Sequence, residues 1–112
     1  MTNETRQTAH TLVPAVDIIE TPAAYVVRLD IPGAERERIS AKVEENTLTV
    51  SAPVSAAGEV SKDIEPVREY RREFSLANDV DVQSIDARYE LGVLTITLNK
   101  KTQYLPKEIS IN

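Results

Sequence analysis

The side chains that most often perform catalysis are few and scattered in this sequence. His10 is the only histidine, and no residue of matching chemistry lies near it in the polar stretch that contains it. The chain has no cysteine, which leaves no thiolate for a nucleophile, a metal site or a disulfide. Carboxylates fall in turns and at outward strand positions, and so do the hydroxyl groups. We therefore predict that the protein is not an enzyme and has no cofactor and no metal.

The sequence contains three candidate residues for binding, namely two isoleucines and one arginine. Ile109 and Ile111 are two residues apart, so in an extended chain both side chains project to the same side and can fill one groove together. Arg72 alternates with Tyr70 and Phe74, which places its charge on the apolar face of a predicted strand. An unpaired charge there is costly, so we expect an acidic partner from the same chain or from a second copy.

Composition limits the kind of protein this is. A chain of 112 residues is enough for one domain, small enough to benefit from association. Its net charge of −5 disfavours nucleic acid as a partner, because nucleic acid requires a basic surface. The sequence has no apolar run that could span a membrane and no signal-peptide pattern. We expect a cytoplasmic protein that binds neither nucleic acid nor membranes.

The elements that must position these residues are short strands. Alternating apolar and polar residues predict strands over 16–21, 25–30, 39–44, 47–52, 68–76, 85–89 and 93–100. Turn residues separate them at Ile31-Pro32-Gly33, Glu45-Asn46 and Leu91-Gly92. About seven short strands with closely spaced turns indicate an all-β, immunoglobulin-like antiparallel β-sandwich. Periodicity alone leaves a small barrel as the alternative.

Two segments flank the predicted sandwich of residues 14–100, and a third is a loop within it. Residues 1–13 are polar and aperiodic, and we predict a short disordered N-terminal arm. Residues 101–112 form a C-terminal extension that carries Ile109 and Ile111. The stretch from Pro53 to Pro66 predicts a long mobile loop, in which residues 60–65 could form a short edge strand.

Motifs along most of the chain resemble those of the small heat-shock proteins, of the bacterial type with a short N-terminal arm. Gly92-Val93-Leu94 followed by Lys100 resembles the family's G-V-L motif with its terminal lysine. Leu91 stands where the family usually has Asn or Asp, while Asn99 and Ala77 stand where it usually has Pro. The other resembling segments are residues 14–20, 29–33, 46–50, 71–76 with 80–81, and 109–111.

The resemblance implies an α-crystallin domain, which favours the sandwich over the barrel. It also implies an ATP-independent stress-response chaperone, a holdase, that binds non-native client proteins, forms a homodimer and assembles further through its tail. In this family the I-x-I tail of one subunit enters a groove on another. The groove would be formed by Ile39, Ala41 and Val43 facing Ile85, Ala87 and Tyr89, and the dimer interface would include Arg72, Val60 and Ile64.

The sequence is also compatible with two other functions. The chain lacks the long aromatic arm with which family members bind clients, so it could instead be an assembly module that co-oligomerises with a longer small heat-shock protein. A CS-domain co-chaperone shares the sandwich, but the I-x-I tail argues against it.

Overall fold

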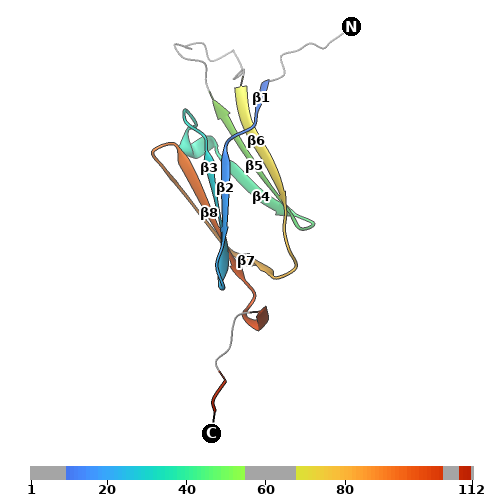
Figure 1. Ribbon diagram of the computed structural model, residues 1–112. Helices are drawn as coiled ribbons and strands as arrows, with labels where there is room; N and C mark the ends of the chain where they lie inside the picture. Colours follow the sequence, from blue (N-terminus) through green and yellow to red (C-terminus); the bar gives the residue numbers. More distant parts are fainter. Residues whose placement is uncertain (1–9, 55–67, 105–108, 112) are drawn as a thin grey trace.

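Two four-stranded sheets form a sandwich in the computed structural model, which describes residues 10–54, 68–104 and 109–111 (Figure 1). The first sheet has the order β1 (His10–Leu12), β6 (Arg68–Ser75), β5 (Thr47–Val54) and β4 (Ser40–Glu44). The second has the order β2 (Val16–Glu20), β3 (Ala24–Asp30), β8 (Val93–Lys100) and β7 (Val80–Glu90). All pairs are antiparallel except β1 with β6. The predicted all-β sandwich is confirmed, and the barrel is excluded because two separate sheets are formed.

The core lies between the inner strands of the two sheets. On β5 the apolar residues Leu48, Val50 and Ala52 are buried, while the residues between them are half-buried. On β8 Leu94, Ile96 and Leu98 repeat this pattern. The period of two that marked these segments in the sequence is therefore the alternation between core and outer face.

Each of the three tight turns contains residues with left-handed backbone, a conformation that suits Gly and Asn better than other residues. The amide of Ala34 donates to the carbonyl of Ile31 at 3.2 Å, and Gly33 has a φ of 91°, as a type II turn requires. The β7–β8 hairpin turns at Leu91 and Gly92, with φ values of 52° and 80°. The β4–β5 hairpin likewise has positive φ at both of its turn residues, Glu45 and Asn46. Two successive positive φ values form the type I′ turn that suits the twist of a hairpin.

Three boundaries differ from the sequence prediction by more than one residue. His10–Leu12 form β1, parallel to the start of β6, so the prediction of a disordered arm is wrong for these residues. A three-residue strand has no periodicity of its own and depends on the β6 edge that it pairs with. β5 extends to Val54, so the loop does not begin at Pro53, and β7 begins at Val80, before the predicted strand start at Ile85.

Local pairing explains the last two boundaries. Pro53 pairs with Glu69 on β6, while the pairing of β5 with β4 has already ended at Ser51, so the missing proline amide is tolerated there. The start of β7 is irregular between Val80 and Ile85, which hides its alternation. The remaining loop residues, including Val60 and Ile64, lie outside the described residues.

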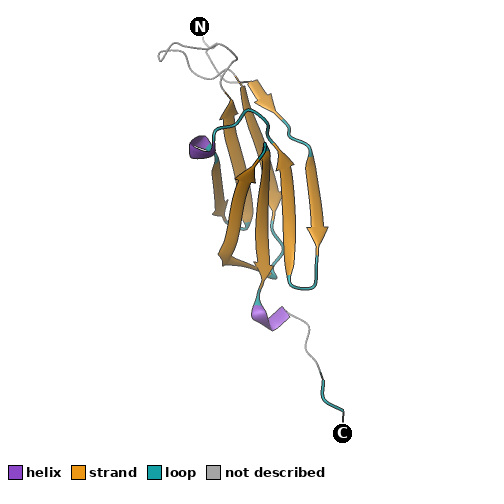
Figure 2. Ribbon diagram, turned by 90° about the vertical axis from the view of Figure 1, so that its left-hand side faces the viewer, coloured by secondary structure: helices purple, strands orange, loops and turns teal. Residues whose placement is uncertain are grey.

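Two short 3-10 helices complete the described chain. The first, η2 (Arg36–Arg38), connects the turn after β3 to β4. The second, η3 (Thr102–Tyr104), follows β8 beyond the end of the sheets (Figure 2). The amides of Lys100 and Lys101 donate to the carbonyls of Ala23 and Asp79, at 2.8 and 2.7 Å. The sandwich therefore holds the backbone as far as Lys101.

Candidate binding groove

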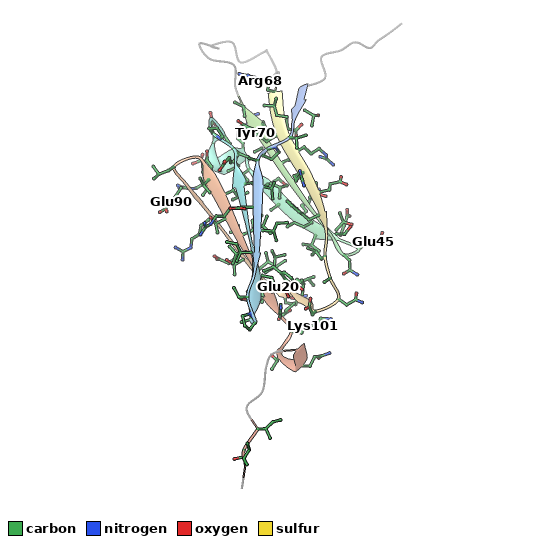
Figure 3. The ribbon with its side chains drawn as sticks, viewed as in Figure 1. Glu20, Glu45, Arg68, Tyr70, Glu90 and Lys101 are labelled. Atoms are coloured by element: carbon green, nitrogen blue, oxygen red, sulfur yellow. The ribbon has the colours of Figure 1, made fainter. Side chains whose placement is uncertain are left out.

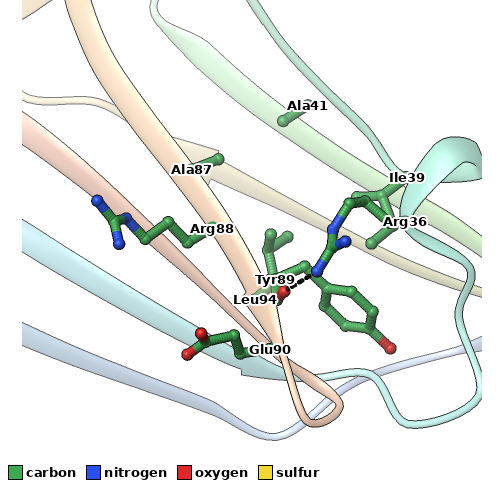
Figure 4. Close-up of a pocket in the computed structure, with 8 residues that line it drawn as sticks. All are labelled: Arg36, Ile39, Ala41, Ala87, Arg88, Tyr89, Glu90 and Leu94. Atoms are coloured by element: carbon green, nitrogen blue, oxygen red, sulfur yellow. Dashed lines mark hydrogen bonds between the residues drawn. The ribbon is translucent and has the colours of Figure 1, made fainter.

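An apolar groove opens between β4 and β7, the last strands of their respective sheets (Figure 4). Its volume is about 450 Å³. Ala41 of β4 pairs with buried Val50, and Ala87 of β7 pairs with buried Ile96, so both alanines lie on the inward-facing rows of their strands. The lining residues are Arg36, Ile39, Ala41, Ala87, Arg88, Tyr89, Glu90 and Leu94.

The structure brings together four of the six residues predicted for this groove. Ile39, Ala41, Ala87 and Tyr89 line it. Val43 and Ile85 are not among the lining residues; both are partly buried and pack against the core. The groove is therefore centred on the two alanines and on the end of β7 that contains Tyr89.

Sequence reasoning missed four lining residues. Leu94 was identified only as part of the G-V-L motif and of the predicted strand over 93–100, although it is a core residue that also lines the groove. Arg88 and Glu90 extend from β7 on the side away from Ile39 (Figure 4). Arg36 comes from η2, a segment in which no strand was predicted, so no sequence signal pointed to it.

Hydrogen bonds close one end of the groove. The Tyr89 hydroxyl donates toward the carbonyls of Ala34 and Ile31, at 2.9 and 3.2 Å. In the opposite direction, Nη2 of Arg36 donates to the carbonyl oxygen of Tyr89 at 2.7 Å (Figure 4). The segment before β4 and the end of β7 are thereby joined, while the part of the groove around Ala41 and Ala87 stays open.

The two tail residues are the most exposed isoleucines of the described chain. The exposed fraction is 83% for Ile109 and 92% for Ile111. No described residue covers them, and large apolar side chains lose stabilisation when they face water. They have the chemistry to fill an apolar groove, and their placement in one remains a prediction.

Arg72 lies on the inward-facing row of β6, as its register predicted. It pairs with buried Val50, and its neighbour on that row, Phe74, pairs with buried Leu48. The guanidinium carbon lies 5.5 Å from the centre of the Phe74 ring, within the range of a cation–π contact. Among the described residues no carboxylate forms an ion pair with Arg72, so its predicted acidic partner is not found in the described part of its own chain.

A polar cluster closes the end of the sandwich from which the tail leaves, where Glu20 and Lys101 are labelled in Figure 3. Nζ of Lys100 lies 2.7 Å from Oε2 of Glu20 and 4.9 Å from the centre of the Tyr25 ring. The Tyr25 hydroxyl donates to the carboxylate of Asp79 at 3.0 Å. Only 10% of the Lys100 side chain is exposed, so this lysine is a structural residue that the sequence identified merely as the end of a strand.

These contacts shift two pKa values in the same direction. The hydrogen bond to Asp79, with burial and the nearby carboxylate charges, raises the pKa of Tyr25 above its ordinary value. The hydrogen bond to Glu20 raises the pKa of Lys100 above its ordinary value, against the opposing effect of burial. Both groups therefore keep their protons more tightly in the folded protein.

Two other kinds of site are absent from the described residues. No cluster of three or more histidine, cysteine, aspartate or glutamate side chains is placed to hold a metal ion within residues 10–54, 68–104 and 109–111. In the same segments, no helix has the length and apolar character needed to cross a membrane.

Relatives of known sequence cover most of the chain. Small heat shock protein C2 of Rickettsia felis is 28% identical over 109 residues, which cover 93% of this chain and 71% of that protein. The 17.4 kDa class III heat shock protein of Arabidopsis thaliana is 31% identical in a match that covers 94% of this chain and 75% of that protein. Other curated relatives are matched over as little as 46% of their length.

Solved structures and a family model agree with these relatives. A small heat-shock protein from Xylella fastidiosa has the same fold, with a TM-score of 0.70 and 24% identity over 90% of this chain and 97% of that one. Residues 17–112 match the model of the Hsp20/alpha crystallin family. Because this match spans nearly the whole sandwich and the tail, the chain belongs to the Hsp20/alpha crystallin family, the small heat-shock proteins.

Proposed function

We propose that the protein is an ATP-independent holdase that binds non-native proteins in the cytoplasm and prevents their aggregation. The observation that carries this proposal is the family match over residues 17–112. The apolar groove and the exposed side chains of Ile18 and Ile19 on β2 support it, because a holdase needs apolar surface that is open to clients. Chaperoning of this kind requires binding alone, without a catalytic centre.

The same proposal includes self-assembly in two steps. We infer a homodimer formed through the β6 side of the sandwich, with Arg72 at the interface together with the predicted Val60 and Ile64. Larger assemblies would form when Ile109 and Ile111 of one subunit enter the groove of another. A dimer contact would offer Arg72 the acidic partner that its own described chain does not provide.

Energetic magnitudes predict a weak, reversible tail contact. Burying two isoleucine side chains contributes about 3–6 kcal/mol. Fixing each tail residue costs about 1–2 kcal/mol, so ordering three or four residues offsets most of that gain. One tail in one groove is therefore weak, and several tails in a closed assembly gain strength from effective concentration.

An aggregation assay tests the holdase proposal. A heat-labile client is heated with the purified protein in the absence of ATP, and light scattering is followed, with an equal mass of an inert protein as the control. Suppression by the pure protein supports the holdase. Suppression only after a longer small heat-shock protein is added would favour the assembly module, and no suppression in either case would contradict both.

A further inference from the structure

The two walls of the groove belong to different sheets. β4 pairs with β5, and β7 pairs with β8, while no backbone ladder joins β4 to β7. Regular hydrogen bonding therefore does not fix the distance between the walls. At one end a single backbone hydrogen bond, from the Ile31 amide to the Gly92 carbonyl at 2.8 Å, joins the turn before η2 to the β7–β8 turn. Side chains form the further bridges at this end.

Arg36 and Tyr89 form such a bridge, in both directions. Tyr89 extends from β7 to the carbonyls of the turn that precedes η2, and Arg36 extends from η2 back to the Tyr89 carbonyl. The arginine bond is short, at 2.7 Å, and its donor is charged, which makes it stronger than a neutral hydrogen bond. The Arg36 side chain is otherwise exposed, so the core does not depend on it.

The position of this bond also limits where a guest strand can pair. β7 is an edge strand, and its inner partner is β8, so the Tyr89 carbonyl that meets Arg36 is on the open edge. Carbonyl directions alternate along a strand, so the carbonyls of Ala87 and Ile85 face the same edge as that of Tyr89. Arg36 occupies the acceptor at Tyr89 and leaves the two others available.

We propose that Arg36 is a positioning residue that closes the Tyr89 end of the groove and sets the register of the bound tail. In this arrangement the Ile109–Ile111 segment of another subunit pairs with the open edge of β7 and stops before Tyr89. It lies in the groove at Ala87 and extends past the lining residues to Ile85. The inference rests on the proposed function in one respect, because it assumes that the groove binds the tail.

Peptide binding tests this role in the full chain. The Ile109→Ala/Ile111→Ala variant keeps its own tail out of the groove, and it is titrated with a fluorescent peptide of residues 105–112 followed by anisotropy. Adding Arg36→Ala to this variant should weaken peptide binding about five- to tenfold. Adding Arg38→Ala, which removes the same charge from an exposed residue of the same helix, should leave it unchanged.

Two further measurements distinguish a positioning role of Arg36 from an effect of the substitution on folding. The melting temperature of the Arg36→Ala protein should match that of the Arg38→Ala protein, and Arg36→Lys should restore part of the affinity. In NMR spectra, peptide-induced amide shifts on β7 should centre on Ile85 and Ala87, and they should extend to Tyr89 only when Arg36 is replaced.

The outcomes distinguish the two proposals. If the variant that retains Arg36 does not bind the peptide, both the tail–groove contact and the role of Arg36 are wrong. If it binds the peptide, and Arg36→Ala and Arg38→Ala give equal affinity and the same pattern of shifts, the tail–groove contact stands and the role of Arg36 is refuted.

Discussion

Replacing Leu91 with Asn should stabilise the fold. Leu91 is the first turn residue of the β7–β8 hairpin, its φ is 52°, and its side chain is 100% exposed. A left-handed conformation costs an ordinary L-residue about 1–2 kcal/mol, whereas Asn tolerates it well. A fully exposed leucine contributes no burial that would be lost. We therefore expect Leu91→Asn to raise the free energy of unfolding by about 1 kcal/mol.

Urea unfolding followed by far-UV circular dichroism, at equal protein concentrations, measures this gain. For a domain of this size, a gain of about 1 kcal/mol corresponds to a rise in melting temperature of about 4–8 °C. Leu91→Ala is the matched control, because it also removes the exposed side chain but leaves a Cβ residue at positive φ. Equal stability of the Asn and Ala variants would refute the explanation by backbone conformation.

Other contacts give further predictions. Ile109→Ala/Ile111→Ala should leave the dimer intact and dissolve anything larger, as native mass measurements over a dilution series would reveal; assemblies that survive both changes would show that the tail is not the link. Arg72→Ala should lower the melting temperature or the dimer fraction by the equivalent of about 0.5–1 kcal/mol, because the cation–π contact with Phe74 is lost. The loss should be larger if the change leaves a carboxylate of the partner subunit unpaired. No change in either quantity would contradict the pairing of Arg72 with an acidic residue. Because folding raises the pKa of Lys100 and of Tyr25, their stabilisation should be complete below about pH 10 and be lost as the pH rises beyond it. Urea midpoints measured from neutral to strongly alkaline pH should therefore fall less steeply in Lys100→Met than in the unchanged chain.

Strands with one face in the core and one outer face could be predicted from the sequence. β5 and β8 alternate between core and outer face, so their pattern is visible in the sequence. The type II turn at Pro32-Gly33 was also visible, because each residue has a distinct backbone preference. β1 was missed because a three-residue edge strand is stabilised by its neighbour and not by its own sequence.

The groove could be predicted only in part, for a related reason. Ala41 and Ala87 follow the alternation of their strands, so their inward direction was predictable. Arg36 reaches the groove through a hydrogen bond across a separation of 53 residues, which only the packing of the two sheets creates. Lys100 was missed in the same way, because its carboxylate partner, Glu20, comes from a strand near the other end of the chain.

Formation of a soluble complex with a client tests the central claim most directly. The protein and a heat-labile client are heated together without ATP, cooled and centrifuged, and the supernatant is separated by size-exclusion chromatography with multi-angle light scattering. The holdase account predicts that the client remains in the supernatant and elutes with the protein at a mass above that of either alone. A client that pellets completely while the protein elutes by itself, at its unheated mass, would contradict the account.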